Sequence, residues 1–289
     1  MRTLREVLRD AERRGVAVGH FNISEIGALK AIAEVAKELK LPVIVGTSEG
    51  EREFLDIHDA VALVRDLREK HGQEIYLNAD HTKSLEKIKE AVNAGYDAVL
   101  FDGGALPLEK NIEITKAVVK YVREFNKGIL VEGELGNIGS GSTIRKELPK
   151  GAAIKPEDLT HPEDAVRFVK ETGVDLLAPA VGNIHGMFAN APEPALNIDR
   201  IREIKDATGI PLVLHGGSGN TDADFLAAIA VGVRIIHIST ELRLAWRKGM
   251  EATLKDKPDE VAPYKLMEGS IEEMKKVLTQ RLKLFNHIK

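Results

Sequence analysis

The sequence predicts an α/β protein that forms a single-domain (β/α)8 TIM barrel with closing helices at its carboxyl end. Eight short apolar runs rich in β-branched residues alternate with longer segments whose apolar residues recur at helical spacing. The runs are too uniformly apolar to alternate, as expected of parallel strands that are buried on both faces. The chain has 289 residues, and such a barrel needs about 250. One barrel therefore accounts for most of the chain.

The predicted elements follow one another in a regular order along the chain. An amphipathic helix at the amino terminus comes first, and helical spacing is clearest over residues 26–39, 85–92 and 112–122. Gly95, Gly173 and Gly232 stand where a left-handed residue would end a helix before the next strand. We place the eight strands at residues 16–21, 42–47, 74–79, 97–101, 128–132, 174–181, 211–215 and 233–238.

Two segments interrupt this alternation. A loop at about 137–161 follows the fifth strand, and loops of this length on a compact barrel are often mobile lids or binding loops. Beyond about residue 242 the strand pattern stops, and helical spacing over 271–284 predicts helices packed on the barrel or on another subunit. We therefore expect one domain over residues 1–289, with a long βα loop and a helical extension at about 242–289.

Composition excludes several classes of function. The formal net charge is −4 and no basic tract occurs, so neither nucleic acid nor a membrane surface is an expected partner. No segment approaches the about 18 apolar residues that a membrane span requires. Cysteine is absent, so any metal must be held by His, Asp or Glu. We expect a cytoplasmic protein.

Three histidines lie where apolar runs end: His81, His185 and His215. A single histidine in such a place is more often a hydrogen-bonded structural residue. The carboxyl ends of all strands of a (β/α)8 barrel meet at one rim, however, and active sites lie there. Three neutral imidazoles with an open position are typical of a catalytic zinc site. The pattern therefore predicts a metal centre at this rim.

Asp80 directly precedes His81, and two interpretations of it stay open. On a regular strand the two side chains would point to opposite faces, unless a turn brings both toward the mouth of the barrel. Asp80 either caps the helix that starts near Ser84 or acts as a general acid or base beside a metal-bound oxygen.

Further carboxylates lie at the ends of the fourth and fifth runs. Asp102 stands beside two glycines, where it either forms a turn or approaches the metal. Strand alternation puts Glu132 and Glu134 on one face. They either form salt bridges inside the barrel, bind a second metal position, or orient the histidines.

The segments after the seventh and eighth strands predict an anion site. Barrels commonly build a phosphate site there from backbone N–H groups, hydroxyls and a helix N-terminus. A glycine-serine turn alone is unspecific, so its position after the seventh strand carries the prediction. The candidates are Gly216, Gly217, Ser218, Gly219, Ser239 and Thr240.

Together these motifs resemble the class II, metal-dependent ketose-bisphosphate aldolases, which cleave or form fructose or tagatose 1,6-bisphosphate through dihydroxyacetone phosphate. The resemblance extends over most of the chain, and the ordered set is specific where single motifs are not. It rests on Val16, Gly19, Phe21 and Asn22, residues 46–50, Asp80 and His81, Asp102 and Gly103, residues 132–136, His185 and Gly186, residues 215–219, and residues 239–241.

The resemblance implies roles for these residues. His81, His185 and His215 would bind zinc, which cobalt, iron or manganese could replace, and Asp80 would transfer the proton of the C4 hydroxyl. Asp102 and Glu134 would carry the metal in an alternative position. Substrate and its phosphate would meet Asn22, Ser48, Gly186, Gly216, Gly217, Ser218, His237, Ser239 and Thr240. A monovalent cation, a homodimer or homotetramer, and a role in glycolysis or gluconeogenesis are further implications.

Three departures from the family pattern concern the substrate. His237 and Ser239 stand where the family usually has Asn-x-Asp-Thr or Asn-x-Asn-Thr. The first glutamate of the long loop, Glu147, comes well after the loop's glycines, so no loop acid is assigned to proton transfer. Glu268 stands where the family often has an arginine for the distal phosphate, supplied across a subunit interface, although a small register shift would offer Lys265.

We therefore expect a zinc-dependent aldolase that cleaves a ketose 1,6-bisphosphate, foremost fructose 1,6-bisphosphate, to dihydroxyacetone phosphate and an aldehyde such as glyceraldehyde 3-phosphate. Three alternatives stay open. They are a related aldolase with a different or unphosphorylated acceptor aldehyde, another barrel lyase or isomerase of phosphosugars, and a non-catalytic homologue that binds sugar phosphates. Schiff-base chemistry is disfavoured because no predicted strand end carries a lysine.

Overall fold

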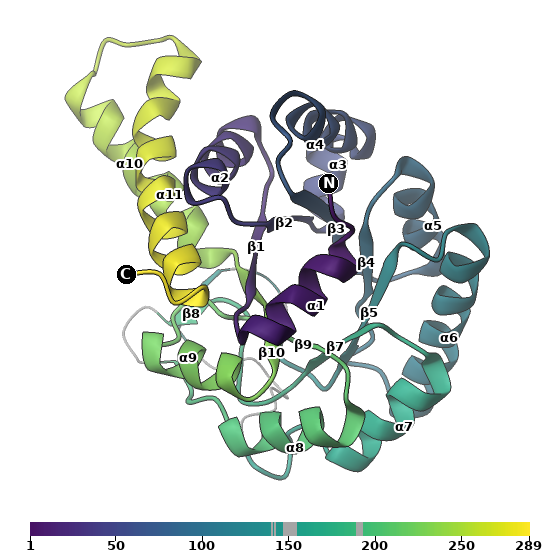
Figure 1. Ribbon diagram of the computed structural model, residues 1–289. Coiled ribbons are helices and arrows are strands. Elements are labelled where there is room, and N and C mark those ends of the chain that lie inside the picture. The colour runs from purple at the N-terminus through teal and green to yellow at the C-terminus, as the bar shows by residue number, and fades with distance from the viewer. Residues whose placement is uncertain (140, 142, 147–154, 189–192) are drawn as a thin grey trace.

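The protein folds as a closed barrel of eight parallel strands surrounded by helices (Figure 1). The computed structural model describes residues 1–139, 141, 143–146, 155–188 and 193–289. The strand order β1-β10-β9-β7-β5-β4-β3-β2 closes on itself, so the first and last barrel strands are neighbours. This confirms the predicted TIM barrel.

The barrel strands lie within a few residues of the predicted runs. They are β1 (Val18–Asn22), β2 (Val43–Thr47), β3 (Ile75–Thr82), β4 (Ala98–Phe101), β5 (Leu130–Leu135), β7 (Leu176–Pro179), β9 (Leu212–Leu214) and β10 (Val233–Ile238). The helices are α1 (Leu4–Arg14), α2 (Ile26–Leu39), α3 (Glu49–Leu55), α4 (Ile57–His71), α5 (Leu85–Ala94), α6 (Leu108–Phe125), α7 (Pro162–Thr172), α8 (Ile198–Thr208), α9 (Asp222–Ala230), α10 (Thr240–Asp256) and α11 (Pro263–Phe285).

Two features differ from the sequence-based expectation. β5 ends at Leu135 rather than at residue 132, so Glu132 and Glu134 both lie inside a strand. Two short strands, β6 (Ile144–Arg145) and β8 (Met187–Phe188), pair in a second sheet that links the loop after β5 to the segment after His185. Strands of two residues show no periodicity, so the sequence pattern could not predict them. Much of the predicted 137–161 loop, including residues 147–154, lies outside the described residues.

Helix ends follow the predicted glycine positions in two cases of three. Gly95 and Gly173 cap α5 and α7 with φ values of 108° and 74°, in the left-handed region that glycine adopts without strain. In the third case α9 is capped by Val231 at φ −104°, and Gly232 follows with a φ of 122° directly before β10.

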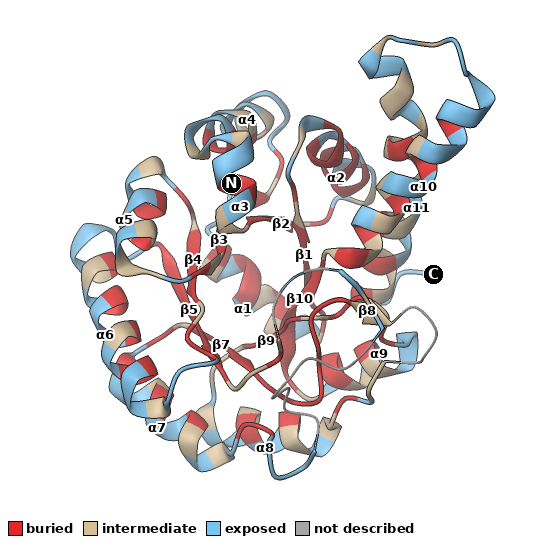
Figure 2. Cartoon of the chain, turned by 180° about the vertical axis from the view of Figure 1, so that it is seen from behind, coloured by how far each residue is buried: buried red, intermediate tan, exposed pale blue. Residues whose placement is uncertain are grey.

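Helix α1 lies across one end of the barrel (Figure 1). Its first turn is fixed by a capping box between Thr3 and Glu6. Its apolar face then packs into the barrel interior, where it forms a buried cluster with residues of the strands. The cluster comprises Leu4, Val7, Leu8, Ala11, Val16, Val18, Ile44, Tyr76, Ala98, Leu130, Leu176, Ala178, Val213 and Ile235. A larger buried cluster lies between the strands and the outer helices (Figure 2).

The carboxyl-terminal helices α10 and α11 pair closely and extend away from the barrel (Figure 1). Their contact depends on glycine, because a Cβ atom on Gly249 would lie 2.2 Å from the carbonyl oxygen of Gly269. These helices confirm the predicted closing extension. No helix formed by the described residues is long and apolar enough to cross a membrane.

Candidate active site

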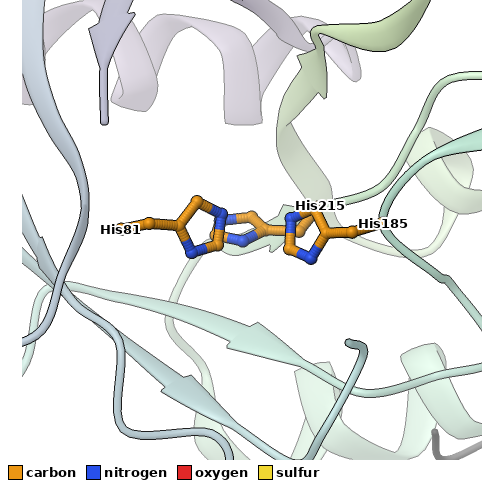
Figure 3. A group of neighbouring side chains, drawn as sticks. All are labelled: His81, His185 and His215. Atoms are coloured by element: carbon orange, nitrogen blue, oxygen red, sulfur yellow. The ribbon is translucent and has the colours of Figure 1, made fainter. Parts of the chain in front are cut away.

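Three histidines from distant parts of the chain converge at one end of the barrel (Figure 3). His81 comes from β3, His185 follows β7, and His215 follows β9. Each offers a ring nitrogen, and the three nitrogen atoms lie within 4.8 Å of one another. The ring centroids are 4.6 Å apart for His81 and His185, 4.9 Å for His81 and His215, and 5.8 Å for His185 and His215.

The other nitrogen of each ring has a partner that fixes the ring's orientation. The pairs are His81 Nδ1 with Asp102 Oδ2 at 3.2 Å, His185 Nδ1 with the Gly139 carbonyl at 3.1 Å, and His215 Nε2 with Glu132 Oε1 at 2.7 Å. Such partners hold metal-binding imidazoles in one tautomer. Glu132 thus orients a histidine, which was one of the open interpretations.

The donor set fits a metal ion. His215 Nδ1 and Glu134 Oε2 are buried and lie 3.1 Å apart, yet neither has a hydrogen-bond partner among the described residues. Buried polar atoms are almost always paired, so these two atoms are suited to hold an ion between them. Three imidazoles, each with one nitrogen left over, match the three-ligand pattern of a catalytic zinc site.

A distortion of β3 brings Asp80 and His81 to the same side. The pairing of β3 with β4 changes register between Ala79 and Thr82, and His81 has a φ of 40°, in the left-handed region that non-glycine residues rarely adopt. As a result both side chains line one cavity. Ser84, not Asp80, caps α5, since its hydroxyl accepts from the Lys87 N–H. The capping interpretation of Asp80 is therefore wrong.

The two carboxylate oxygens of Asp80 differ in their hydrogen bonding. Its Oδ2 accepts from Asn22 Nδ2 at 2.9 Å. Its Oδ1 is buried without a hydrogen-bond partner among the described residues and lies 3.5 Å from His237 Nδ1. Burial alone would raise the pKa of Asp80, but the charge of His81 and the bond from Asn22 oppose it, and the net direction is downward. The group is thus an ionised base at neutral pH.

The carboxylates around the histidines change the pKa values of the imidazoles. Burial would lower the pKa of His81, but Asp80 and Asp102 outweigh it and raise the pKa to about 9. Glu132 and Glu134 likewise overcome burial and raise the pKa of His215. A metal that binds here must therefore displace protons from these rings.

Asp102 and Glu134 form a second group with His81, in which the three ligand atoms also lie within 4.8 Å of one another. Burial raises the pKa of Glu134. Because His81 belongs to both groups, the two carboxylates stand where one ion could occupy an alternative position, as the resemblance implies.

A third group, of His20, Asp80 and His237, does not fit a metal. The rings of His20 and His237 are parallel within 3° and their centroids lie 3.5 Å apart. The lone pair of an imidazole nitrogen lies in the plane of its ring, so one ion cannot lie in both planes.

A cavity of about 30 Å³ is lined by His81 and His185, two of the three histidines. Gly186 and Gly216 bring backbone close to it, with φ values of 96° and 58°, and a Cβ atom on Gly216 would lie 2.3 Å from the Ile184 carbonyl oxygen. The Ser239 hydroxyl is buried without a hydrogen-bond partner within the described parts of the chain. The lining residues are Asn22, Asp80, His81, His185, Gly186, Gly216, Ser218, His237, Ser239 and Thr240.

Some predicted residues lie elsewhere. Gly217 does not line this cavity, and its N–H donates to the His237 carbonyl. Ser48 begins α3 and donates to Glu51, and it lines a neighbouring hollow of about 290 Å³. Glu147 lies outside the described residues.

The two candidates for the distal-phosphate position lie on the outer part of α11. Glu268 is paired with Lys257 at 3.5 Å, and Lys265 with Glu260 at 3.0 Å. Neither residue lines the cavity or the neighbouring hollow of its own chain.

Sequence analysis missed three buried residues near the site. His20 stacks on His237, Asn78 lies beside His20, and Glu51 binds both Asn22 and Arg243. His20 and Asn78 lie inside strands, so a search of strand ends could not select them. The sequence signal that could have identified them is a polar residue within an otherwise apolar strand.

A barrel whose rim gathers three imidazoles, buried carboxylates and a glycine-lined cavity defines a TIM-barrel enzyme with a candidate metal site. Comparison with known protein families identifies the family to which this enzyme belongs. The sequence model described as "Fructose-bisphosphate aldolase class-II" matches residues 2–289. The chain belongs to the class II fructose-bisphosphate aldolase family and is a metal-dependent lyase.

Individual relatives match along almost the whole chain. The fructose-bisphosphate aldolase of Staphylococcus epidermidis and the probable fructose-bisphosphate aldolase of Bacillus subtilis are each 34% identical over 286 residues, covering 98% of this chain and 96% of the relative. The solved YdjI aldolase of Escherichia coli K12 is 31% identical with a TM-score of 0.82, over 98% of this chain and 96% of that one. The fructose-bisphosphate aldolase of Campylobacter jejuni, at 20% identity and a TM-score of 0.80 over 99% of this chain and 94% of that one, supports the fold alone.

Proposed function

We propose that this aldolase reversibly cleaves a ketose 1,6-bisphosphate, foremost fructose 1,6-bisphosphate, to dihydroxyacetone phosphate and an aldehyde such as glyceraldehyde 3-phosphate. One observation carries the proposal: the unpaired Oδ1 of Asp80 lies beside the three convergent imidazoles, at a cavity lined by glycine backbone. The relatives named as fructose-bisphosphate aldolases, at 34% identity, support this choice of substrate.

His81, His185 and His215 would hold the metal, with zinc as the first candidate and cobalt, iron or manganese as alternatives. When bound, the ion supplies Lewis-acid polarisation of the substrate carbonyl. Asp102 and Glu134 would offer it an alternative position. Glu132 keeps His215 in the tautomer that leaves Nδ1 free to bind.

Asp80 would take the proton of the C4 hydroxyl in cleavage and return it in synthesis. A carboxylate of lowered pKa is ionised at neutral pH and therefore ready to accept a proton. Asn22 binds Oδ2 and leaves Oδ1 available, so the proton would move at Oδ1.

The phosphate of dihydroxyacetone phosphate would lie against Gly186, Gly216, Ser218, Ser239 and Thr240. Positive-φ glycines allow close backbone approach, and Thr240 is the first residue of α10, whose helix dipole favours an anion at this end. Gly217 would support this turn through its bond to His237 rather than bind the phosphate directly. A monovalent cation near this phosphate, a homodimer or homotetramer, and a cytoplasmic location complete the proposal.

A second candidate is a class II aldolase that uses a different acceptor aldehyde, including an unphosphorylated one. His237 and Ser239 line the cavity where the family usually has Asn and Asp or Asn, and Glu268 stands in place of the expected arginine. The YdjI aldolase of Escherichia coli K12, at 31% identity, is a relative whose name specifies no bisphosphate substrate.

The test is cleavage of fructose and tagatose 1,6-bisphosphate, coupled to NADH-dependent reduction of dihydroxyacetone phosphate. Activity that is lost with EDTA and restored by zinc supports the proposal. Absence of cleavage, combined with condensation of dihydroxyacetone phosphate with unphosphorylated aldehydes, would favour the second candidate. Zinc binding without either reaction would point to a non-catalytic homologue.

A further inference from the structure

Three buried imidazoles from adjacent strands form a continuous stack beside the metal site. His20 on β1 and His237 on β10 are register partners on neighbouring strands. Their rings are parallel within 3° at 3.5 Å, and His237 stacks in turn on His215 at 4.1 Å. His215 and His237 are already accounted for in the site, whereas His20 contacts neither the cavity nor the metal-binding atoms directly.

The surroundings of His20 hold its ring in one place. The side chain is fully buried, and Asn78 Nδ2 lies 3.1 Å from its Nε2. A Cβ atom on Gly46 would lie 2.1 Å from His20 Cε1, so the ring occupies space that only glycine leaves open on β2. Burial lowers the pKa of His20 to about 4, and the ring is therefore neutral and can stack without charge repulsion.

Between its two neighbours, the side chain of His237 can change its orientation only by a flip of the ring. Its ring plane is fixed by His20 on one face and His215 on the other. Within that plane Nδ1 lies 3.5 Å from Asp80 Oδ1, while Nε2 is buried without a hydrogen-bond partner among the described residues. A ring flip would put Cδ2 in the place of Nδ1 and Cε1 in the place of Nε2, and so remove the contact with Asp80.

We propose that His20 is a positioning residue for the aldol reaction, which holds His237 with Nδ1 toward Asp80 and with Nε2 free to accept a hydrogen bond from a substrate hydroxyl. The inference rests on the proposed function and deepens it. In this arrangement His237 donates to the proton-transferring oxygen and also contacts the substrate. His20 contributes through His237 alone.

The decisive experiment is a double-mutant cycle on kcat for fructose 1,6-bisphosphate cleavage by the zinc-loaded enzyme. His20→Leu removes the flat face, and His237→Asn removes the ring it supports. We expect His20→Leu to lower kcat about tenfold in the native background, with KM nearly unchanged. The free energy of pairing between two aromatic rings corresponds to a change in rate of about this size. In the His237→Asn background, His20→Leu should lower kcat by less than about twofold. Equal losses in both backgrounds would overturn the inference.

Two further variants separate positioning from general packing. His20→Phe keeps a flat ring and should recover much of the kcat lost in His20→Leu. Tyr76→Leu removes a fully buried ring from the barrel interior at the α1 end, so it should lower the melting temperature without a selective loss of kcat. If His20→Leu does not fold, Gly46→Ala provides the same measurement, because its Cβ displaces the His20 ring.

A spectroscopic measurement keeps this inference separate from the proposed function. In zinc-loaded protein labelled with ¹⁵N-histidine, the signals that disappear in His237→Asn belong to His237. A single tautomer protonated at Nδ1, which becomes a mixture in His20→Leu, supports the positioning role even if neither bisphosphate is cleaved. An unchanged tautomer in His20→Leu refutes the role even if the enzyme is fully active.

Discussion

Replacement of Glu132 should weaken metal binding in a graded way, although Glu132 is not itself expected to touch the ion. Glu132 Oε1 lies 2.7 Å from His215 Nε2, and both side chains are almost fully buried. A hydrogen bond to a charged partner contributes about 1.5–3 kcal/mol and a neutral one about 0.5–1.5 kcal/mol. Glu132→Gln keeps the neutral bond and should therefore cost about 1 kcal/mol, which is about fivefold in zinc affinity.

Glu132→Leu removes the bond and leaves the His215 N–H buried without a partner. The zinc affinity should therefore fall by about a hundredfold. Zinc affinity would be measured by competition with a chromophoric chelator at constant pH. Asp175→Asn is a control, because Asp175 is a partly buried carboxylate that pairs with Arg123 and Arg5. It should lower the melting temperature without a change in zinc affinity. Equal zinc affinities for the wild type, Glu132→Gln and Glu132→Leu would refute the role assigned to Glu132.

Four further outcomes are expected. Asp80→Asn should lower kcat by about 10²–10⁴-fold at full zinc occupancy; metal analysis beside steady-state kinetics checks this, and parallel loss of zinc would contradict it. The pKa of His81 is about 9 without metal and that of His215 is also raised, so zinc must displace protons below that pH. Affinity should then weaken about tenfold per pH unit for each displaced proton as pH falls, whereas equal affinity at pH 6, 7 and 8 would refute displacement. Gly216→Ala should destabilise the fold by about 1–3 kcal/mol in thermal unfolding, because its φ is 58° and the Ile184 carbonyl is close; an unchanged melting temperature would contradict this. Ser84→Ala removes the α5 cap and should cost about 1 kcal/mol of stability with kcat retained; a large loss of kcat would count against separate roles for Ser84 and Asp80.

The barrel and its metal-site candidates could be predicted because both depend on patterns that recur along the chain. Eight apolar runs and the helical segments between them are a local property of the sequence. The strands of a parallel barrel all place their carboxyl ends on one rim. His81, His185 and His215 each lie where an apolar run ends, so the three residues had to meet there. The histidine triad therefore followed from topology without any knowledge of side-chain contacts.

The orientation of Asp80 could not be predicted, because it depends on one irregular pairing. Regular alternation would have placed Asp80 and His81 on opposite faces. The change of register between β3 and β4, together with the positive φ of His81, places them side by side. Such a bulge carries no composition marker when the residue in the left-handed region is not glycine.

The stack of His20 on His237 was missed for a different reason. It depends on closure of the barrel, which makes the first and last strands neighbours and puts these two residues at one level. A search for chemistry at strand ends passes over His20, which lies inside β1. Aligning the first strand with the last, once a closed barrel is predicted, would have brought the two histidines together.

The amino-terminal helix has a consequence for ligand traffic. Leu4, Val7 and Leu8 fill the end of the barrel opposite the histidines, together with Tyr76 and other strand residues. A path straight through the barrel is closed by packed side chains, so every ligand must enter and depart by the rim that holds the metal-binding residues. Both products of the proposed cleavage would therefore leave by this same rim.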